Sequence, residues 1–395
     1  MIVLPVTRRA RTSLFFTAAL TCSLCAPPAP AQSPGRDAAI ALEQQSRIPE
    51  AEQAWRSIAA ADSSNAEAFA HLGLIASRQE HFADAIASYN KAFALAPNMP
   101  GLQMNLGLAL FKAAQFPDAI KNFSAQFNLH PDAATANHLI ILLGMAHYGM
   151  GDYFVAIPYL ERAAEHDPQS LALRLTLAHS CLWSKQYDCV LNVYKQILSL
   201  NADSAEADMI AGEALDEKGD DAGAIEQFRA ATHANPKEPN AHFGLGYLLW
   251  KQQHFEEAIP EFQAELDIDP VQSQARAYLA DCQVEIKQFD KARSELEQLV
   301  NGPGPAVGMA MVHRDLGIVY AEVGDPGNAA KELQKAVLLD PAYVSAHWRL
   351  ARVYQSTGDK TLAKSEFDLV SAMKQKSSRS LIQAMDSAAP PALHP

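Results

Sequence analysis

The sequence predicts an all-α protein built as an array of helix pairs, and three observations support this fold class. Small residues recur 34 residues apart, as at Gly73 and Gly107 and again at Gly212 and Gly246. Twelve residues after each such residue the sequence has alanine in nine of ten copies, and four residues later it has a large apolar side chain. A period of this length is typical of repeat proteins, in which each unit buries its apolar face against its neighbours.

Each recurring residue has a steric role within its copy. Small residues at the eighth and twentieth positions allow two antiparallel helices to approach closely, and the large residue at the twenty-fourth fills the space toward the next copy. Proline at the thirty-second position ends the second helix in six copies. Between the helices, pairs such as Gly151-Asp152 and Gly219-Asp220 combine a C-terminal glycine with an N-capping carboxylate.

This pattern resembles the tetratricopeptide repeat, and the resemblance covers residues 32–377. It implies a right-handed superhelix of α-helix pairs, a solenoid of about ten repeats. The predicted repeats are 32–65, 66–99, 100–133, 137–170, 171–204, 205–238, 239–272, 273–306, 310–343 and 344–377. The register slips by three residues near Ala134 to Ala136 and near Val307 to Met309, and we interpret both slips as longer loops. Residues 378–395 are predicted to form a short capping helix around Leu381 to Met385 and a disordered tail.

The first 31 residues predict a secretory signal peptide. Three arginines precede a mostly apolar run from Leu14 to Leu24, and a small-residue cleavage site ends at Ala31. The alternative is a lipoprotein signal, because Cys22 and Cys25 lie late in the apolar run. We therefore expect export of the chain to the periplasm or the medium.

Composition and motifs argue against several classes of function. The formal net charge is -13, from 32 basic and 45 acidic residues, and nucleic acid binding needs a basic face. No second apolar stretch approaches the length of a membrane span. The sequence has no His-Glu-x-x-His helix, no Gly-x-Ser-x-Gly elbow and no phosphate-binding glycine loop. We expect neither an enzyme nor a cofactor or metal site.

Two cysteines of the predicted fifth repeat leave an alternative open. Cys181 and Cys189 roughly face each other across the turn between two helices, so a disulfide could form in an oxidising compartment. Two small, separately buried cysteines are the interpretation that the sequence favours.

A binding face is predicted on the first helix of each pair, where the resemblance implies that positions 2, 5, 6, 9, 12 and 13 point to the concave side. Large side chains recur there with spacings of four and three, which places each trio on one helix face. In the predicted fifth repeat, for example, the trio consists of Leu175, His179 and Leu182. The candidate partner-binding residues are Met104, Leu108, Phe111, Ile141, Met145, Tyr148, Leu175, His179, Trp183, Phe243, Tyr247, Trp250, Arg314, Arg349 and Arg352.

The alternative is that this apolar stripe belongs to the core. Positions 8, 20 and 24 already supply the expected packing, which favours an exposed groove. Charges interrupt the stripe, with Glu213, Asp216 and Glu217 in the sixth repeat and arginines in the last two.

The sequence as a whole predicts a scaffold or adaptor outside the cytoplasm that binds a protein or peptide segment in this groove. The resemblance implies that the protein is part of a machinery for envelope assembly, secretion or polysaccharide export. The alternative function is a glycan-binding accessory protein, in which Tyr148, Trp183, Phe243, Tyr247 and Trp250 stack on sugars. The oligomeric state is not predicted.

Overall fold

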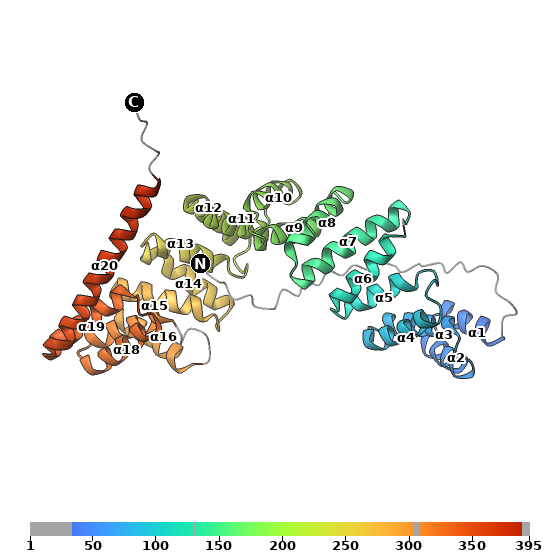
Figure 1. Ribbon diagram of the computed structural model, residues 1–395, viewed down its shortest axis with the longest axis horizontal. Helices are drawn as coiled ribbons and strands as arrows, with labels where there is room; N and C mark the ends of the chain where they lie inside the picture. The colour runs from blue at the N-terminus through green and yellow to red at the C-terminus, as the bar shows by residue number, and fades with distance from the viewer. Residues whose placement is uncertain (1–33, 130, 303–308, 389–395) are drawn as a thin grey trace, which may run out of the picture. The chain divides into compact units, whose positions relative to one another are not determined.

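The structure, a computed structural model, describes residues 34–129, 131–302 and 309–388, and in these ranges it contains only helices, α1 to α20 (Figure 1). The predicted all-α fold class is confirmed. The predicted signal peptide and the end of the predicted tail, residues 389–395, lie outside the described residues. No helix in the described part of the chain has the length and apolar character needed to cross a membrane.

The chain divides into two compact units between His166 and Asp167. In the first unit each helix packs on the next along the chain, and the first helices α3 and α5 also touch each other. Its helices are α1 Pro34–Gln44, α2 Ile48–Ala61, α3 Ala66–Arg78, α4 Phe82–Leu95, α5 Leu102–Lys112, α6 Phe116–Phe127, α7 Ala133–Met150 and α8 Tyr153–His166.

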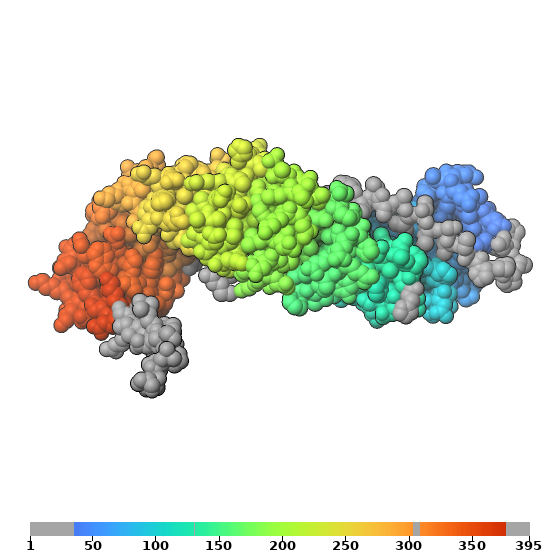
Figure 2. Space-filling model, turned by 90° about the horizontal axis from the view of Figure 1, so that it is seen from above, coloured from blue at the N-terminus to red at the C-terminus, as the bar shows by residue number. Residues whose placement is uncertain are grey.

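The second unit continues the same alternation of first and second helices, and Figure 2 shows its repeats following one another in chain order from green to red. Its first helices, which are the odd-numbered ones, contact one another in a row from α9 to α19. The helices are α9 Leu171–Trp183, α10 Tyr187–Leu200, α11 Ala205–Glu217, α12 Asp221–Ala234, α13 Ala241–Lys251, α14 Phe255–Ile268, α15 Ser273–Glu285, α16 Phe289–Asn301, α17 Ala310–Glu322, α18 Pro326–Leu339, α19 Val344–Thr357 and α20 Lys360–Ala388.

The small residue at the eighth position is required by the large residue at the twenty-fourth. A Cβ atom added to Gly73 would lie 2.6 Å from the ring of Tyr89, and one added to Gly107 would lie 2.7 Å from the ring of Phe123. Both rings are fully buried. The predicted reason for the spacing, close approach of the two helices of a pair, is therefore confirmed.

The turn within each helix pair needs one residue in the left-handed region. Glycine occupies it at Gly151, Gly219, Gly324 and Gly358, where φ lies between 81° and 89°. Asp220, the next residue after one of these glycines, caps the following helix by accepting a hydrogen bond from the Gly223 amide. The corresponding turn position holds a non-glycine residue with positive φ in the other pairs, at Ser46, Glu80, Ala114, Lys185, Gln253 and Lys287.

Two local predictions are wrong. Residues 134–136 form the first turn of α7 and not a loop, because Asp132 caps the helix through the Thr135 amide and alanine favours helix. Residues 378–388 continue α20 and do not form a separate capping helix, since neither glycine nor proline occurs between Lys360 and Ala388. The second register slip falls largely on residues 303–308, outside the described residues.

Candidate functional site

In the first unit the predicted stripe is only partly exposed. Met104, Leu108 and Phe111 on α5 are half-buried and pack against the buried core of α3 to α7. The ring of Phe111 meets that of Phe116 edge to face, with ring centres 5.7 Å apart. These side chains therefore share their surface between the core and the outside of the helix.

The α7 residues behave in the same way. Ile141, Met145 and Tyr148 are half-buried, and the ring centre of Tyr148 lies 5.7 Å from that of Tyr153 on α8. Partly exposed apolar side chains thus lie on both α5 and α7, but they also pack against neighbouring residues of their own unit.

In the second unit α9 presents an exposed indole. Trp183 is 41% exposed, and one face of its ring stacks on His179 with ring centres 5.0 Å apart. The Nε2 atom of His179 lies 2.9 Å from a carboxylate oxygen of Glu206 on the next first helix, α11. Leu175 is half-buried and Leu182 is buried, so α9 offers mainly Trp183 to a partner.

The largest concentration of aromatic side chains spans α13 and α15. We call Tyr247, Trp250 and Tyr278 the aromatic cluster; all three are half-buried. The ring centre of Tyr278 lies 4.8 Å from that of Trp250 and 5.5 Å from that of Tyr247, both edge to face. Because neighbouring rings fix one another in place, the cluster is a rigid apolar surface that needs little ordering to bind an apolar side chain.

Phe243 was predicted to line the groove, and this prediction is wrong. Phe243 is only 2% exposed, because its ring is enclosed by Phe262 and Tyr278 at ring-centre distances of 6.0 Å each. The backbone N–H of Phe243 donates to the buried carboxylate of Glu265. The residue therefore anchors α13 to α14 and belongs to the core.

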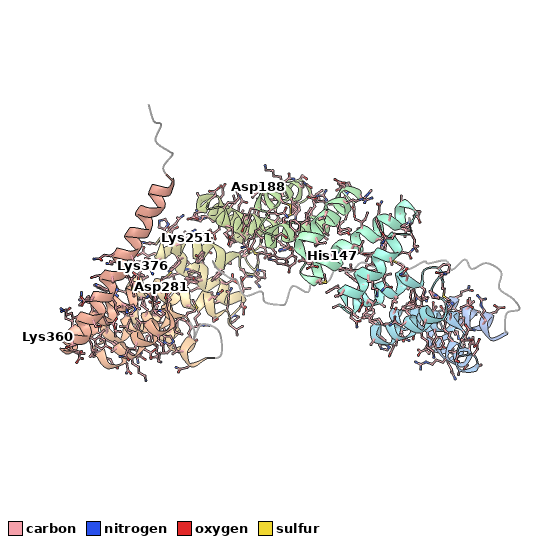
Figure 3. All side chains as sticks on the ribbon, viewed as in Figure 1. His147, Asp188, Lys251, Asp281, Lys360 and Lys376 are labelled. Atoms are coloured by element: carbon pink, nitrogen blue, oxygen red, sulfur yellow. A yellow bond between two sulfur atoms is a disulfide. The ribbon has the colours of Figure 1, made fainter. Side chains whose placement is uncertain are left out.

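Carboxylates of α11 border the aromatic cluster on one side. Lys251 of α13, labelled in Figure 3, bridges Asp216 at 3.1 Å and Asp221 at 2.8 Å. Burial raises the pKa of Glu213 to about 7, and the negative charges of Glu217 and Asp216 add to the effect while His179 opposes it. This side of the face is therefore acidic and only partly neutralised.

Arg314 was predicted as a cation of the groove, but the structure buries it in an internal network. Its side chain is 12% exposed, and its guanidinium pairs with Asp281 of α15 and with Asp315. Asp281, labelled in Figure 3, also accepts a hydrogen bond from the indole N–H of Trp250. Burial raises the pKa of Asp315 well above its usual range, although Arg314 opposes the shift. The network joins α13, α15 and α17.

The other two predicted arginines lie on α19 beside an exposed indole. Trp348 is 37% exposed, and the guanidinium carbons of Arg349 and Arg352 lie 5.3 Å and 5.2 Å from its ring centre. We call these three residues the α19 cluster. The sequence analysis missed Trp348 and Tyr278, although both occupy inward positions of their predicted repeats and the register alone could have found them.

Three histidines occupy the fourth position of their predicted repeats, and each has its own acidic partner. His242, His313 and His347 each lie within hydrogen-bonding distance of a glutamate 19 residues later in the chain, on the second helix of the same pair. They stabilise helix pairs. Among the described residues, no group of three or more His, Cys, Asp or Glu side chains is arranged to hold a metal ion.

The two cysteines left open by the sequence form a disulfide between α9 and α10. The Cα atoms of Cys181 and Cys189 are 5.8 Å apart. The favoured interpretation, two separate buried thiols, is not what the structure shows. Cys282, by contrast, is a free buried thiol.

Comparisons with known proteins bear on the same repeats. A family profile described as tetratricopeptide repeat matches residues 36–100, 191–239, 222–273 and 314–370, which together exceed half of the chain. A second profile with the same description matches residues 147–212 and 249–302. Comparison with curated proteins gives no match.

Several solved structures are similar at low sequence identity. YrrB, described as a tetratricopeptide repeat protein with an unusual peptide-binding site, is 21% identical over 47% of this chain and 95% of its own, with a TM-score of 0.43. MamA from Desulfovibrio magneticus RS-1 is 21% identical over 44% of this chain and 96% of its own, with a TM-score of 0.39. A repeat protein from Parabacteroides merdae is 16% identical over 68% of this chain and 97% of its own, with a TM-score of 0.45.

Proposed function

Because the chain belongs to the tetratricopeptide repeat family, whose members are scaffolds for protein binding, we propose that it is an exported scaffold that holds a partner segment on the first-helix face of its second unit. The observation that carries the proposal is the aromatic cluster. Tyr247, Trp250 and Tyr278 keep partial exposure on two adjacent first helices, in addition to the buried residues that already pack each pair. Preorganised aromatic surface of this kind supplies anchor sites in protein interfaces.

Export is supported by two independent features. The first 31 residues have the charge and apolar pattern of a secretory signal, and the Cys181–Cys189 disulfide is of a kind that persists in oxidising compartments. N-terminal sequencing of the protein recovered from cells tests the proposal. A chain that starts at Gln32 agrees with export and with cleavage after Ala31, a chain that starts at a lipid-modified Cys22 or Cys25 agrees with export as a lipoprotein, and an unprocessed chain contradicts export.

Partner binding can be tested by site-specific photo-crosslinking in living cells. A photoreactive phenylalanine derivative in place of Tyr247 should form adducts with a partner protein under ultraviolet light. The matched control is Leu338 on the second helix α18, which is 79% exposed but lies outside the first-helix face. Adducts at both positions, or at neither, contradict a specific binding face.

The glycan-binding alternative has weaker support. Sugars stack on open ring faces, but the rings of Tyr247, Trp250 and Tyr278 contact one another. Binding of the purified protein to soluble polysaccharides, measured by calorimetry, decides between the two. Saturable binding that Tyr247→Ala abolishes would favour the glycan function.

A further inference from the structure

The α19 cluster holds two guanidinium groups without a carboxylate partner among the described residues. Arg276 and Arg314 in the same unit both pair with acidic side chains, whereas Arg349 and Arg352 lie against the indole of Trp348 and form no ion pair with a described residue. The chain carries 45 acidic residues, so carboxylates are not scarce. The two groups therefore retain hydrogen-bond donors for a ligand.

Their arrangement suits an anion. A guanidinium next to an aromatic ring is held by a cation–π interaction and keeps its N–H groups free for bidentate contact with a carboxylate. Arg349 and Arg352 are three residues apart on one helix, where like charges repel each other. A bound carboxylate would remove that repulsion, so the cluster gains more from an acidic ligand than isolated arginines would.

We propose that the α19 cluster binds acidic side chains of an extended partner segment whose apolar residues lie on the aromatic cluster; this inference rests on the proposed function. The first helices α15, α17 and α19 contact one another in sequence. Packed helices are about 8 to 10 Å apart, and an extended chain advances about 3.3 Å per residue. The acidic residues of the segment then lie about five or six residues from an apolar side chain on Tyr278 of α15, and about seven to nine residues from one on Tyr247 or Trp250 of α13.

The acidic side of the face gives the segment a direction. Glu213, Asp216 and Glu217 lie on α11, on the other side of the aromatic cluster from α19. Acidic residues of a partner placed there would meet like charges, which disfavours the reversed position. The same carboxylates and the net charge of -13 oppose a polyanionic surface, so a peptide fits better than an anionic membrane.

The test is selection of random peptides displayed on phage against the purified protein. Peptides enriched by the wild type should contain an aromatic or aliphatic residue about five to nine positions from a pair of Asp or Glu residues. The double variant Arg349→Glu/Arg352→Glu should keep the apolar preference and lose the acidic one. The control Lys360→Glu/Lys364→Glu makes the same charge change on α20 and should select as the wild type does.

Binding of one selected peptide then gives the magnitude. The arginine variant loses one or two charge-assisted hydrogen bonds, so its Kd for the peptide should rise at least about tenfold. The Kd of the control variant, which keeps these hydrogen bonds, should change less than about twofold. Circular dichroism melts verify that each variant folds. If the glutamate variant melts early, Arg349→Gln/Arg352→Gln replaces it, because glutamine removes the charge without adding repulsion.

The outcomes separate the inference from the proposed function. Apolar enrichment without an acidic preference, or equal loss in the α20 control, overturns the α19 site and leaves the binding face intact. Failure of the wild type to enrich any peptide overturns both. Binding to phosphatidylglycerol vesicles that the arginine variant loses, in the absence of peptide selection, would replace the peptide with a membrane surface.

Discussion

The variant Arg314→Met should destabilise the second unit strongly at neutral pH. Methionine fills a similar volume, but it removes the one cation, among the residues that the structure describes, that pairs with Asp281 and Asp315, whose side chains are almost completely buried. Breaking a buried ion pair by removing one partner typically costs about 3 to 5 kcal/mol, because a buried charge is left uncompensated. Here the single substitution leaves two such groups.

The pH dependence of this loss follows from the carboxyl groups. Burial raises the pKa of Asp315 in the folded state, and the opposing effect of Arg314 is absent in the variant. A carboxyl with a raised folded-state pKa favours folding below its unfolded value of about 4, and this contribution is lost as pH rises through the folded-state pKa. The variant should therefore differ least from the wild type near pH 4 and most at pH 7 and above.

Urea denaturation followed by tryptophan fluorescence measures the effect, and Trp250 reports locally because its indole N–H donates to Asp281. The triple variant Arg314→Met/Asp281→Asn/Asp315→Asn removes the buried charges together and should recover much of the stability at pH 7. A single variant that unfolds like the wild type at pH 7, or a loss that is the same at pH 4, would refute a buried charge network.

Two further predictions concern local conformation and titration. Ala114→Gly should raise the free energy of unfolding, measured by thermal melts, by about 0.5 to 1 kcal/mol, because Ala114 has a φ of 57° that glycine adopts without strain. Its neighbour Ala113 has an ordinary φ of -78°, so Ala113→Gly should lower the free energy of unfolding by a similar amount in the same melts. Burial raises the pKa of Glu213 to about 7, so the protonated side chain favours folding below about pH 4, and this contribution is lost as pH rises through 7. Glutamine does not titrate, so Glu213→Gln should reduce the fall in the free energy of unfolding between pH 6 and 8 by about 1 to 2 kcal/mol.

Residues whose role is set within one helix pair could be predicted from the sequence. The spacing of 16 residues between Gly73 and Tyr89 identifies a close contact that the structure contains, and the glycines before Asp220 and Asp325 mark turns that it also contains. Such contacts are fixed by helix geometry and by the length of the turn, so every copy repeats the same evidence. Repetition of one local rule along the sequence makes the fold predictable.

Residues whose role depends on a neighbouring pair could not be assigned in this way. Phe243 occupies the same helix position as Met104, yet it is buried because Tyr278 of the next pair covers it. Arg314 is buried because Asp281, 33 residues earlier, lies opposite it. The partners vary from copy to copy, so the repeat pattern carries no information about which inward positions stay exposed.

Position in the row does not explain why the arginines of α19 lack carboxylate partners among the described residues, because α19, like α17, is preceded by a first helix that it contacts. At Arg314 a preceding first helix supplies the carboxylate of Asp281, and each inner first helix has a neighbour on both sides. Among the described helices, α19 is the last first helix and contacts only α17 in that row. If these positions only had to be soluble, lysine or glutamate would serve as well as arginine. Neither of them, however, combines a planar group that stacks on Trp348 with paired hydrogen-bond donors, as Arg349 and Arg352 do. The choice of arginine at this end is therefore better explained by an acidic ligand than by solubility.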